Sequence, residues 1–168
     1  MTVKAPPSDL NQNTQPRVPD LLSRPVTLIP EIIHSSLIVK ILNLVLAQAL
    51  KDEELEFLEN QQVSVEISDL KLKFALGLRN QQLVAKTWRT GDDLNLSGVL
   101  YDFMLLASRQ EDSDTLFFHR RLKMEGSTDL GLEVKNLLDG MDTDTVRFHK
   151  HIDVALRHGI KVFEHIFK

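Results

Sequence analysis

The sequence predicts an α+β domain, in which a mainly antiparallel sheet of about five strands is covered by helices. Three observations predict this class. Apolar residues recur at every second position within residues 63–67 and again within residues 70–76, which is typical of half-buried strands. Segments on either side, residues 31–50 and 99–109, carry apolar residues at helical spacing instead. The composition, 42% hydrophobic and 26% charged over 168 residues, suits one compact globular domain with a tail.

The first expected element is one long helix over residues 31–50. Three polar residues interrupt its apolar run, so a buried helix, or one shared between core and lipid, fits better than a membrane span. The acidic segment that follows would be unfavourable at a helix C-terminus. We therefore expect a break near Lys51 and a short helical turn through Phe57.

Two alternating segments follow the helix. Val63, Val65 and Ile67 share one face of the first strand, whereas the apolar residues of the second strand, at residues 70–76, occupy even positions. This change of parity at residues 68–69 requires a tight hairpin or a bulge. Shorter strands are expected at residues 83–86 and 94–97, after turns at residues 79–81 and 91–93. We expect these strands to make an antiparallel sheet of about four strands.

Helices and a fifth strand complete the expected domain. Ser97 is a reasonable N-cap for the helix at residues 99–109. Ser127 or Thr128 can cap the next long helix, which Gly140 ends. The remaining expected elements are a polar loop at residues 111–114, a helical turn at residues 116–119, a strand at residues 121–125, a turn at Gly126 and a last helix at residues 145–168.

Composition and motifs exclude several classes of function. The chain has no Cys, so disulfides, thiolate zinc sites and Cys nucleophiles are excluded. Its formal net charge of −4 argues against general nucleic-acid binding. No nucleotide-binding glycine loop and no serine-hydrolase elbow occurs. Residues 1–19 are polar and Pro-punctuated, which predicts a disordered tail without a signal-peptide core and hence a cytoplasmic protein.

The six histidines do not form a recognisable catalytic or metal site. His151, His158 and His165 repeat every seven residues, but no HExxH spacing or clustered carboxylate accompanies them. We interpret them as a solvated, weakly cationic helix face. We therefore expect no cofactor, no metal ion and no catalytic residue. The alternative is an enzyme that uses His119 or the late histidines.

Charge is distributed unevenly along the chain. Residues 145–168 hold five Lys and Arg against two Asp and Glu, a net +3, which leaves −7 for the rest of a chain whose total is −4. The predicted last helix has apolar side chains largely on one side and cations on the other, as membrane-surface helices do. The residues predicted to dock it on an anionic membrane are Phe148, Lys150, Ile152, Arg157, Lys161, Phe163 and Phe167. The alternative is that its apolar face packs onto the domain.

One segment resembles a known family. Residues 114–142, DTLFFHRRLKMEGSTDLGLEVKNLLDGMD, are similar to the signature of bacterial proteins of the sterol-carrier-protein-2 (SCP-2) family, in the ubiquinone accessory factor (UbiT) group. Weaker similarity begins near Pro19 and includes ELEFLEN at residues 54–60. We therefore divide the chain into a tail (1–19), an SCP-2-like lipid-binding domain (20–142) and a C-terminal amphipathic helix (143–168).

The resemblance implies a five-stranded, mainly antiparallel sheet covered by helices, around an apolar cavity that holds an isoprenoid or acyl lipid. It also implies a non-enzymatic accessory role in oxygen-independent ubiquinone biosynthesis, in which the protein presents hydrophobic intermediates alongside the UbiU and UbiV hydroxylases. Such a protein is expected in the cytoplasm, peripheral on the inner membrane. The alternative is a membrane-surface adaptor, or a general phospholipid or isoprenoid carrier, that holds no quinone internally.

We expect the lipid tail to lie between the sheet and the helices. The residues predicted to contact it are Leu42, Leu46, Val65, Ile67, Leu72, Phe74, Leu105, Leu106, Phe117 and Leu137, each of which could equally belong to a plain core. His119, Arg120 and Arg121 are expected to hold a phosphate or carboxylate headgroup. The alternative is that these three are solubilising charges beside an edge strand. Affinity would come from chain length, because each buried CH₂ contributes about 0.8 kcal/mol.

Overall fold

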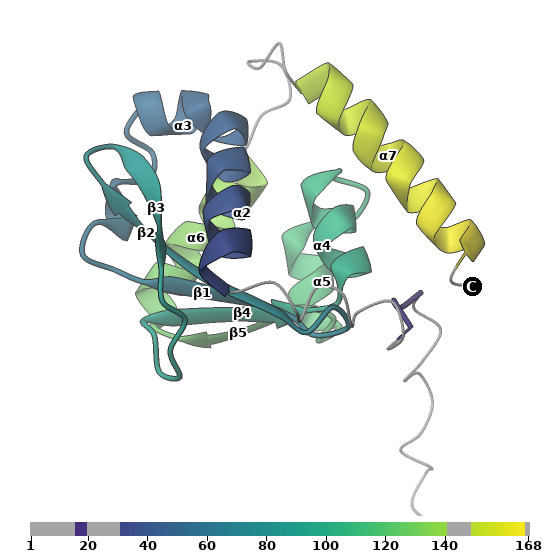
Figure 1. Ribbon diagram of the computed structural model, residues 1–168, viewed down its shortest axis with the longest axis horizontal. Helices are drawn as coiled ribbons and strands as arrows, with labels where there is room; N and C mark the ends of the chain where they lie inside the picture. The colour runs from purple at the N-terminus through teal and green to yellow at the C-terminus, as the bar shows by residue number, and fades with distance from the viewer. Residues whose placement is uncertain (1–15, 20–30, 141–148, 167–168) are drawn as a thin grey trace, which may run out of the picture.

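A computed structural model describes residues 16–19, 31–140 and 149–166 (Figure 1). The elements are α2 (Glu31–Val45), α3 (Ala47–Lys51), the 3-10 helix η1 (Glu56–Leu58), β1 (Val63–Ile67), β2 (Leu72–Arg79), β3 (Gln82–Lys86), β4 (Leu94–Gly98), α4 (Leu100–Ala107), α5 (Ser113–Phe118), β5 (Lys123–Gly126), α6 (Thr128–Gly140) and α7 (His149–Ile166). The predicted tail falls almost entirely on residues 1–15, which lie outside the description. The α+β class is confirmed.

The five strands form one sheet in the order β3-β2-β1-β4-β5. Val65 pairs with Phe74 across the β1–β2 hairpin, so odd residues of β1 and even residues of β2 share a face, as the parity change predicts. Asn80 and Gln81 join β2 to β3 with φ angles of 51° and 56°, the left-handed conformation that a two-residue hairpin turn requires.

The prediction that the first four strands are all antiparallel is wrong at one pair. β4 lies beside β1 and parallel to it, with Val65 opposite Leu96. The other three pairs are antiparallel, so the sheet as a whole is mainly antiparallel, as predicted. Alternation along a strand reports which face is buried, but it does not report which neighbour the strand pairs with.

The core lies between one face of the sheet and the helices. Val63, Val65, Leu72 and Phe74 are each less than a tenth exposed, and side chains of α2, η1 and α6 pack against them. Full burial of such a side chain contributes about 1.5–3 kcal/mol to folding. The apolar alternation predicted for β1 and β2 is therefore the wall of the core.

The helix predicted over residues 31–50 is interrupted at Leu46, where α2 gives way to α3. Hydrogen bonds of 2.8 Å still run from the Leu46 N–H to the Leu42 oxygen and from the Leu50 N–H to the Leu46 oxygen. The interruption is therefore a local turn in an otherwise helical segment. The predicted end near Lys51 and the helical turn through Phe57 are both confirmed.

The two predicted N-caps have different outcomes. Ser127 is confirmed, because the Leu130 N–H donates to its Oγ over 3.3 Å. Ser97 is wrong, because it lies within β4 and α4 begins only at Leu100. The Leu100 N–H donates instead to Oδ1 of Asp69, at 2.9 Å, from the β1–β2 turn. The Asp69 carboxylate, and not the Ser97 hydroxyl, therefore accepts a hydrogen bond from the backbone at the start of α4.

Helix α2 runs along the free edge of β3. The Asn43 side chain accepts a hydrogen bond from the Leu83 N–H (2.9 Å) and donates one to the Leu83 oxygen (2.8 Å). The side-chain amide therefore pairs with the edge strand as a neighbouring strand would. His34 extends this contact to the Lys73 oxygen of β2, 2.9 Å from its Nε2.

Helix α7 packs against α4 and stands apart from the sheet (Figure 1). Its buried side chains in the described part are Ile160 and Phe163, and the Phe163 ring stacks on Tyr101 with the ring centroids 5.9 Å apart. No helix in the described ranges is long and apolar enough to cross a membrane.

Candidate lipid-binding site

An open groove of about 700 Å³ lies between β5, α5 and α6, and we call it the β5 groove. Its apolar lining consists of Leu94, Phe117, Leu122, Met124 and Leu132. Its charged lining consists of Asp114, Arg120, Lys123, Glu125 and Lys135. Apolar walls with a few polar groups are typical of sites for amphipathic small molecules, and the volume lies within their usual range.

The groove borders the core directly. Leu94 is 1% exposed and belongs to the core cluster, and Phe117 and Met124 pack against that cluster. Gly131 lets α6 approach β5 closely, because a Cβ at this position would lie 2.6 Å from the Met124 Sδ. The apolar floor of the groove is therefore the end of the core itself.

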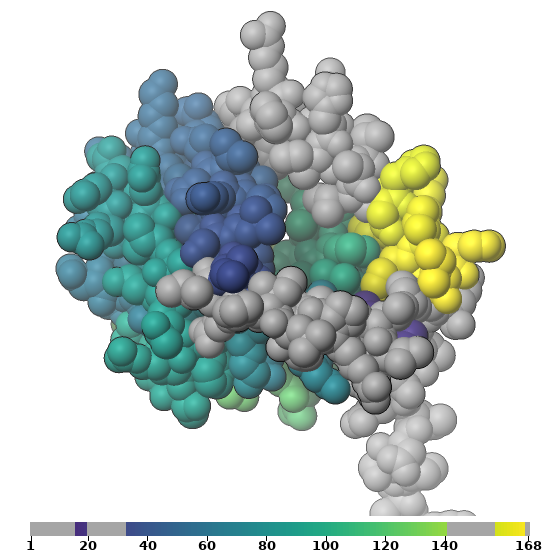
Figure 2. All heavy atoms as spheres, in the orientation of Figure 1, coloured from purple at the N-terminus to yellow at the C-terminus, as the bar shows by residue number. Residues whose placement is uncertain are grey.

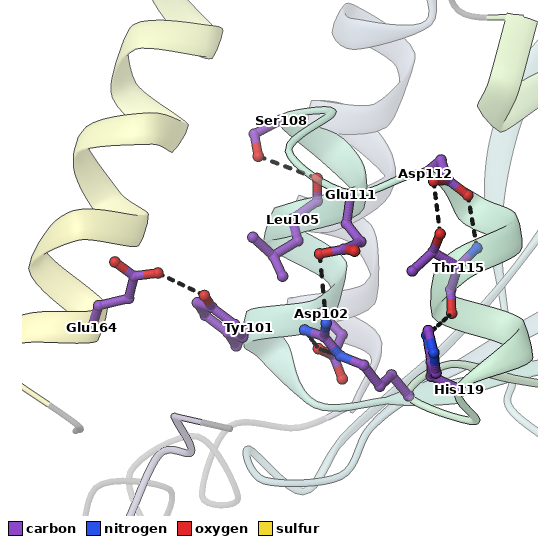
Figure 3. A network of polar contacts seen from close by, with 10 residues as sticks. Tyr101, Asp102, Leu105, Ser108, Glu111, Asp112, Thr115, His119 and Glu164 are labelled. Atoms are coloured by element: carbon purple, nitrogen blue, oxygen red, sulfur yellow. Dashed lines mark hydrogen bonds and ion pairs between the residues drawn. The ribbon is translucent and has the colours of Figure 1, made fainter. Parts of the chain in front are cut away.

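A buried ion pair supports the start of β5. Asp102 of α4 is 1% exposed and accepts from the Arg121 Nε at 2.9 Å, and Glu111 lies 3.6 Å from another nitrogen of the same guanidinium (Figure 3). Burial raises the pKa of Asp102, although its pairing with Arg121 acts in the opposite direction. Removal of one partner of such a pair is strongly destabilising, so this contact holds β5 to α4.

A second polar network orders α5 on the far side of the groove. The Asp112 carboxylate caps this helix by accepting from the Thr115 N–H (2.7 Å) and from the Thr115 hydroxyl (2.8 Å) (Figure 3). These hydrogen bonds lower the pKa of Asp112. The backbone carbonyl oxygen of Thr115 in turn lies 3.0 Å from the His119 Nδ1.

The structure separates the three residues predicted to hold a headgroup. Arg120 lines the β5 groove. The Arg121 guanidinium contacts Asp102 and Glu111, so its placement is structural. The His119 ring lies against its own helix turn and against Phe118. Of the three, Arg120 is the residue at the groove, and its headgroup role stays a prediction.

The ten residues predicted to contact the lipid tail occupy three environments. Those with 5–9% exposure are Val65, Ile67, Leu72, Phe74 and, on α4, Leu105. Those that pack partly buried against the core are Leu42, Leu46, Phe117 and Leu137. Leu106 lines a second, smaller groove of about 390 Å³ together with Leu138. Of the ten, Phe117 is the one that lines the β5 groove.

Among the apolar residues of the groove, the prediction missed four: Leu94, Leu122, Met124 and Leu132. Met124 alternates with charged neighbours in β5, and this signal could have identified it. Leu132 is 57% exposed and lies off the apolar stripe of α6, so helical periodicity excluded it. An exposed Leu next to an edge strand is informative only when the tertiary structure is known.

The residues predicted to dock on a membrane are only partly described. Arg157 and Lys161 are exposed on α7, whereas Phe163 packs inward on α4. Lys150 and Ile152 belong to α7, but their side chains lie outside the described residues, as do Phe148 and Phe167 altogether. Within the described ranges, no group of three or more His, Cys, Asp or Glu side chains could hold a metal ion.

Comparisons with known proteins agree with the fold. A profile of the SCP-2 sterol transfer family matches residues 41–139. The ubiquinone biosynthesis accessory factor UbiT of Escherichia coli K12 is 40% identical over 126 residues, which cover 75% of this chain and 72% of that protein. A solved structure described as a UbiJ-SCP2 ubiquinone synthesis protein superposes with a TM-score of 0.53 at 19% identity, over 66% of this chain and 96% of the other. At this identity the superposition shows the fold alone.

Proposed function

This chain belongs to the SCP-2 sterol transfer family, and we propose that it is an accessory factor of ubiquinone biosynthesis that binds hydrophobic intermediates of the pathway. The observation that carries this proposal is the β5 groove, whose apolar floor is continuous with the core at Leu94. The similarity of the chain to a ubiquinone biosynthesis accessory factor supports the choice of that pathway.

The tail of the lipid would enter at Phe117, Met124 and Leu132 and extend toward the partly buried side chains between sheet and helices. Each buried CH₂ contributes about 0.8 kcal/mol, so a prenyl chain is held by its length alone. Leu42, Leu46 and Leu137 pack against the core from the helix side and are the residues that would move aside. Arg120 at the groove would contact the polar end.

The protein would present the bound intermediate to enzymes and carry out no chemical step itself. On this proposal the partners are the hydroxylases UbiU and UbiV, and the pathway is the oxygen-independent one. Prenylated intermediates partition into the membrane because their tails are apolar. The place of action would therefore be the cytoplasmic surface of the inner membrane.

Extraction of the gently purified protein with organic solvent, followed by mass spectrometry, tests this function. We expect a prenylated quinone precursor in stoichiometric amount. An extract without lipid, from protein that also fails to bind an added prenylated phenol, would contradict the proposal and favour a surface adaptor.

A groove variant locates the site. Leu132→Asp places a carboxylate among the apolar lining, and we expect it to lower affinity for the prenylated phenol at least tenfold. The free energy of unfolding should change by less than about 0.5 kcal/mol, because Leu132 is exposed. Val162→Asp on α7, at a residue of similar exposure, is the matched control and should bind normally. Equal binding by both variants would remove the β5 groove from the proposal.

A further inference from the structure

We propose that the outer face of α7 and an exposed apolar stripe on α2 together dock the protein on an anionic lipid bilayer. This surface is separate from the β5 groove and does not require that lipid be bound inside the protein. It is built from two helices that lie on the same face of the molecule, α2 in dark blue and α7 in yellow in Figure 2.

The inner face of α7 packs against the rest of the protein. Ile160 is 1% exposed and Phe163 is 8% exposed against α4. Glu164 points to Tyr101 and accepts a hydrogen bond from its hydroxyl over 2.6 Å (Figure 3). Helix α7 is therefore held in one orientation, and its opposite side faces outward.

This orientation decides the charge of the outer face. Glu164 is the one carboxylate in residues 157–166, and it is turned inward to Tyr101. The exposed residues of this segment include the cations Arg157 and Lys161 and the histidines His158 and His165. Val162 and Ile166 are 50% and 60% exposed beside them. The outer face thus combines positive charge with aliphatic side chains, which fits an anionic headgroup layer over an apolar interior.

The α2 stripe supplies further apolar surface. Ile33, Leu37, Ile41 and Leu44 are 52–66% exposed, and their spacing places them on one side of the helix. The sequence has no Asp or Glu from residue 32 to residue 51, but it has Lys40 and Lys51 there. Aliphatic side chains without carboxylates insert into a bilayer surface at low cost, whereas an acidic neighbour would be repelled by anionic lipid.

The charge of this docking surface indicates that its partner is an anionic bilayer. The docking surface carries cations on both helices, while the chain as a whole has a net charge of −4. The protein as a whole is therefore not attracted to anionic surfaces, so such an attraction has to come from a local cationic surface such as this one. Each cation close to an anionic leaflet raises membrane partitioning about fivefold.

Flotation of the full chain with lipid vesicles tests the docking surface. We expect binding to vesicles of phosphatidylglycerol and phosphatidylcholine in equal parts, little binding to pure phosphatidylcholine, and loss of binding in high salt because the charge term is screened. Lys161→Glu should weaken binding about tenfold or more, since it exchanges an attraction for a repulsion. Leu37→Asn should weaken it about threefold or more through loss of apolar contact. Both residues are exposed, so circular dichroism should show unchanged folding.

Two matched controls accompany these variants. Arg89→Glu reverses an exposed cation in the β3–β4 loop, and Phe118→Asn removes an 84% exposed aromatic side chain from α5. Both should bind vesicles as the unaltered protein does. Equal binding to the two kinds of vesicle, normal binding by Lys161→Glu, or equal losses in the controls would each overturn the proposal. Failure of the unaltered protein to bind either vesicle would also overturn the proposal, and the docking surface would then be a candidate site for a protein partner.

Discussion

The two edges of the sheet differ, because a helix covers one of them and the other borders an open groove. At β3 the edge is covered by α2, and the Asn43 amide forms two hydrogen bonds with the Leu83 backbone. At β5 the strand borders the 700 Å³ β5 groove, and exposed Leu132 stands beside it. An uncovered sheet edge is usually a liability, so proteins close it or use it. The closed edge here serves stability, and the open edge is the candidate binding site.

The polar contacts at the two edges also differ in chemistry. The β3 edge relies on a side-chain amide, which does not titrate. The open edge is supported by carboxylates, the buried Asp102 at the start of β5 and the capping Asp112 of α5. The open edge is thus firmly held despite the groove, and the carboxylates that hold it make its stability depend on pH.

The largest expected effect tests whether the open edge is firmly held. Asp102→Ala should lower the free energy of unfolding by about 3 kcal/mol, because it removes the buried carboxylate that pairs most closely with the largely buried Arg121 guanidinium. Urea unfolding measures the change. Glu133→Ala, at an exposed residue of α6, is the control and should cost less than about 0.5 kcal/mol. Similar losses in the two variants would show that the ion pair does not support β5.

A smaller effect is expected at the closed edge. Asn43→Ala should lower the free energy of unfolding by about 2 kcal/mol, because the Leu83 N–H and oxygen lose their partner while partly buried. Affinity of the folded protein for a prenylated phenol should not change. Asn136→Ala, at an exposed residue, provides the comparison for stability. If Asn43→Ala lost lipid affinity and Asn136→Ala did not, the β3 edge would take part in lipid binding, and the two edges would not have separate roles.

The smallest expected effect concerns pH. The folded-state pKa of Asp112 lies below its ordinary value of 3.8. The ionised carboxylate therefore contributes fully to folding stability above pH 3.8, and this contribution is lost as the pH falls through the lowered pKa. Asp112→Asn keeps a capping oxygen but does not titrate, so its melting temperature should fall less steeply on acidification below about pH 4. Thermal unfolding between neutral pH and this range measures the slopes. Parallel curves for the variant and the unaltered protein would assign the acid sensitivity to other groups.

Local patterns predicted most of the sheet. The three apolar residues expected in the first strand, Val63, Val65 and Ile67, all lie in β1. The parity change at the hairpin is explained by the pairing of Val65 with Phe74. Both follow from alternation, which is a property of neighbouring residues. The cap of α4 was not predictable in this way, because the Asp69 carboxylate that provides it is 31 residues away from Leu100.

The candidate site was predicted less completely than the fold. The signature segment pointed to Phe117 and Arg120, which do line the β5 groove. It could not distinguish Arg120 from Arg121, since adjacent residues of the same type carry the same sequence signal. The direction of each side chain depends on the left-handed backbone at Arg120, with φ of 57°, and on the position of Asp102.

By itself the sequence determined the alternating strands, the amphipathic helices and the family, because each of these is recorded in the order and spacing of neighbouring residues. Tertiary structure alone decided which sheet edge is open, which arginine is buried, and which side of α7 faces outward. The contacts responsible join residues that are 40 positions apart (Asn43 and Leu83), 19 apart (Asp102 and Arg121) and 63 apart (Tyr101 and Glu164). Periodicity does not extend over such separations, so only the packing of the folded chain brings these groups together.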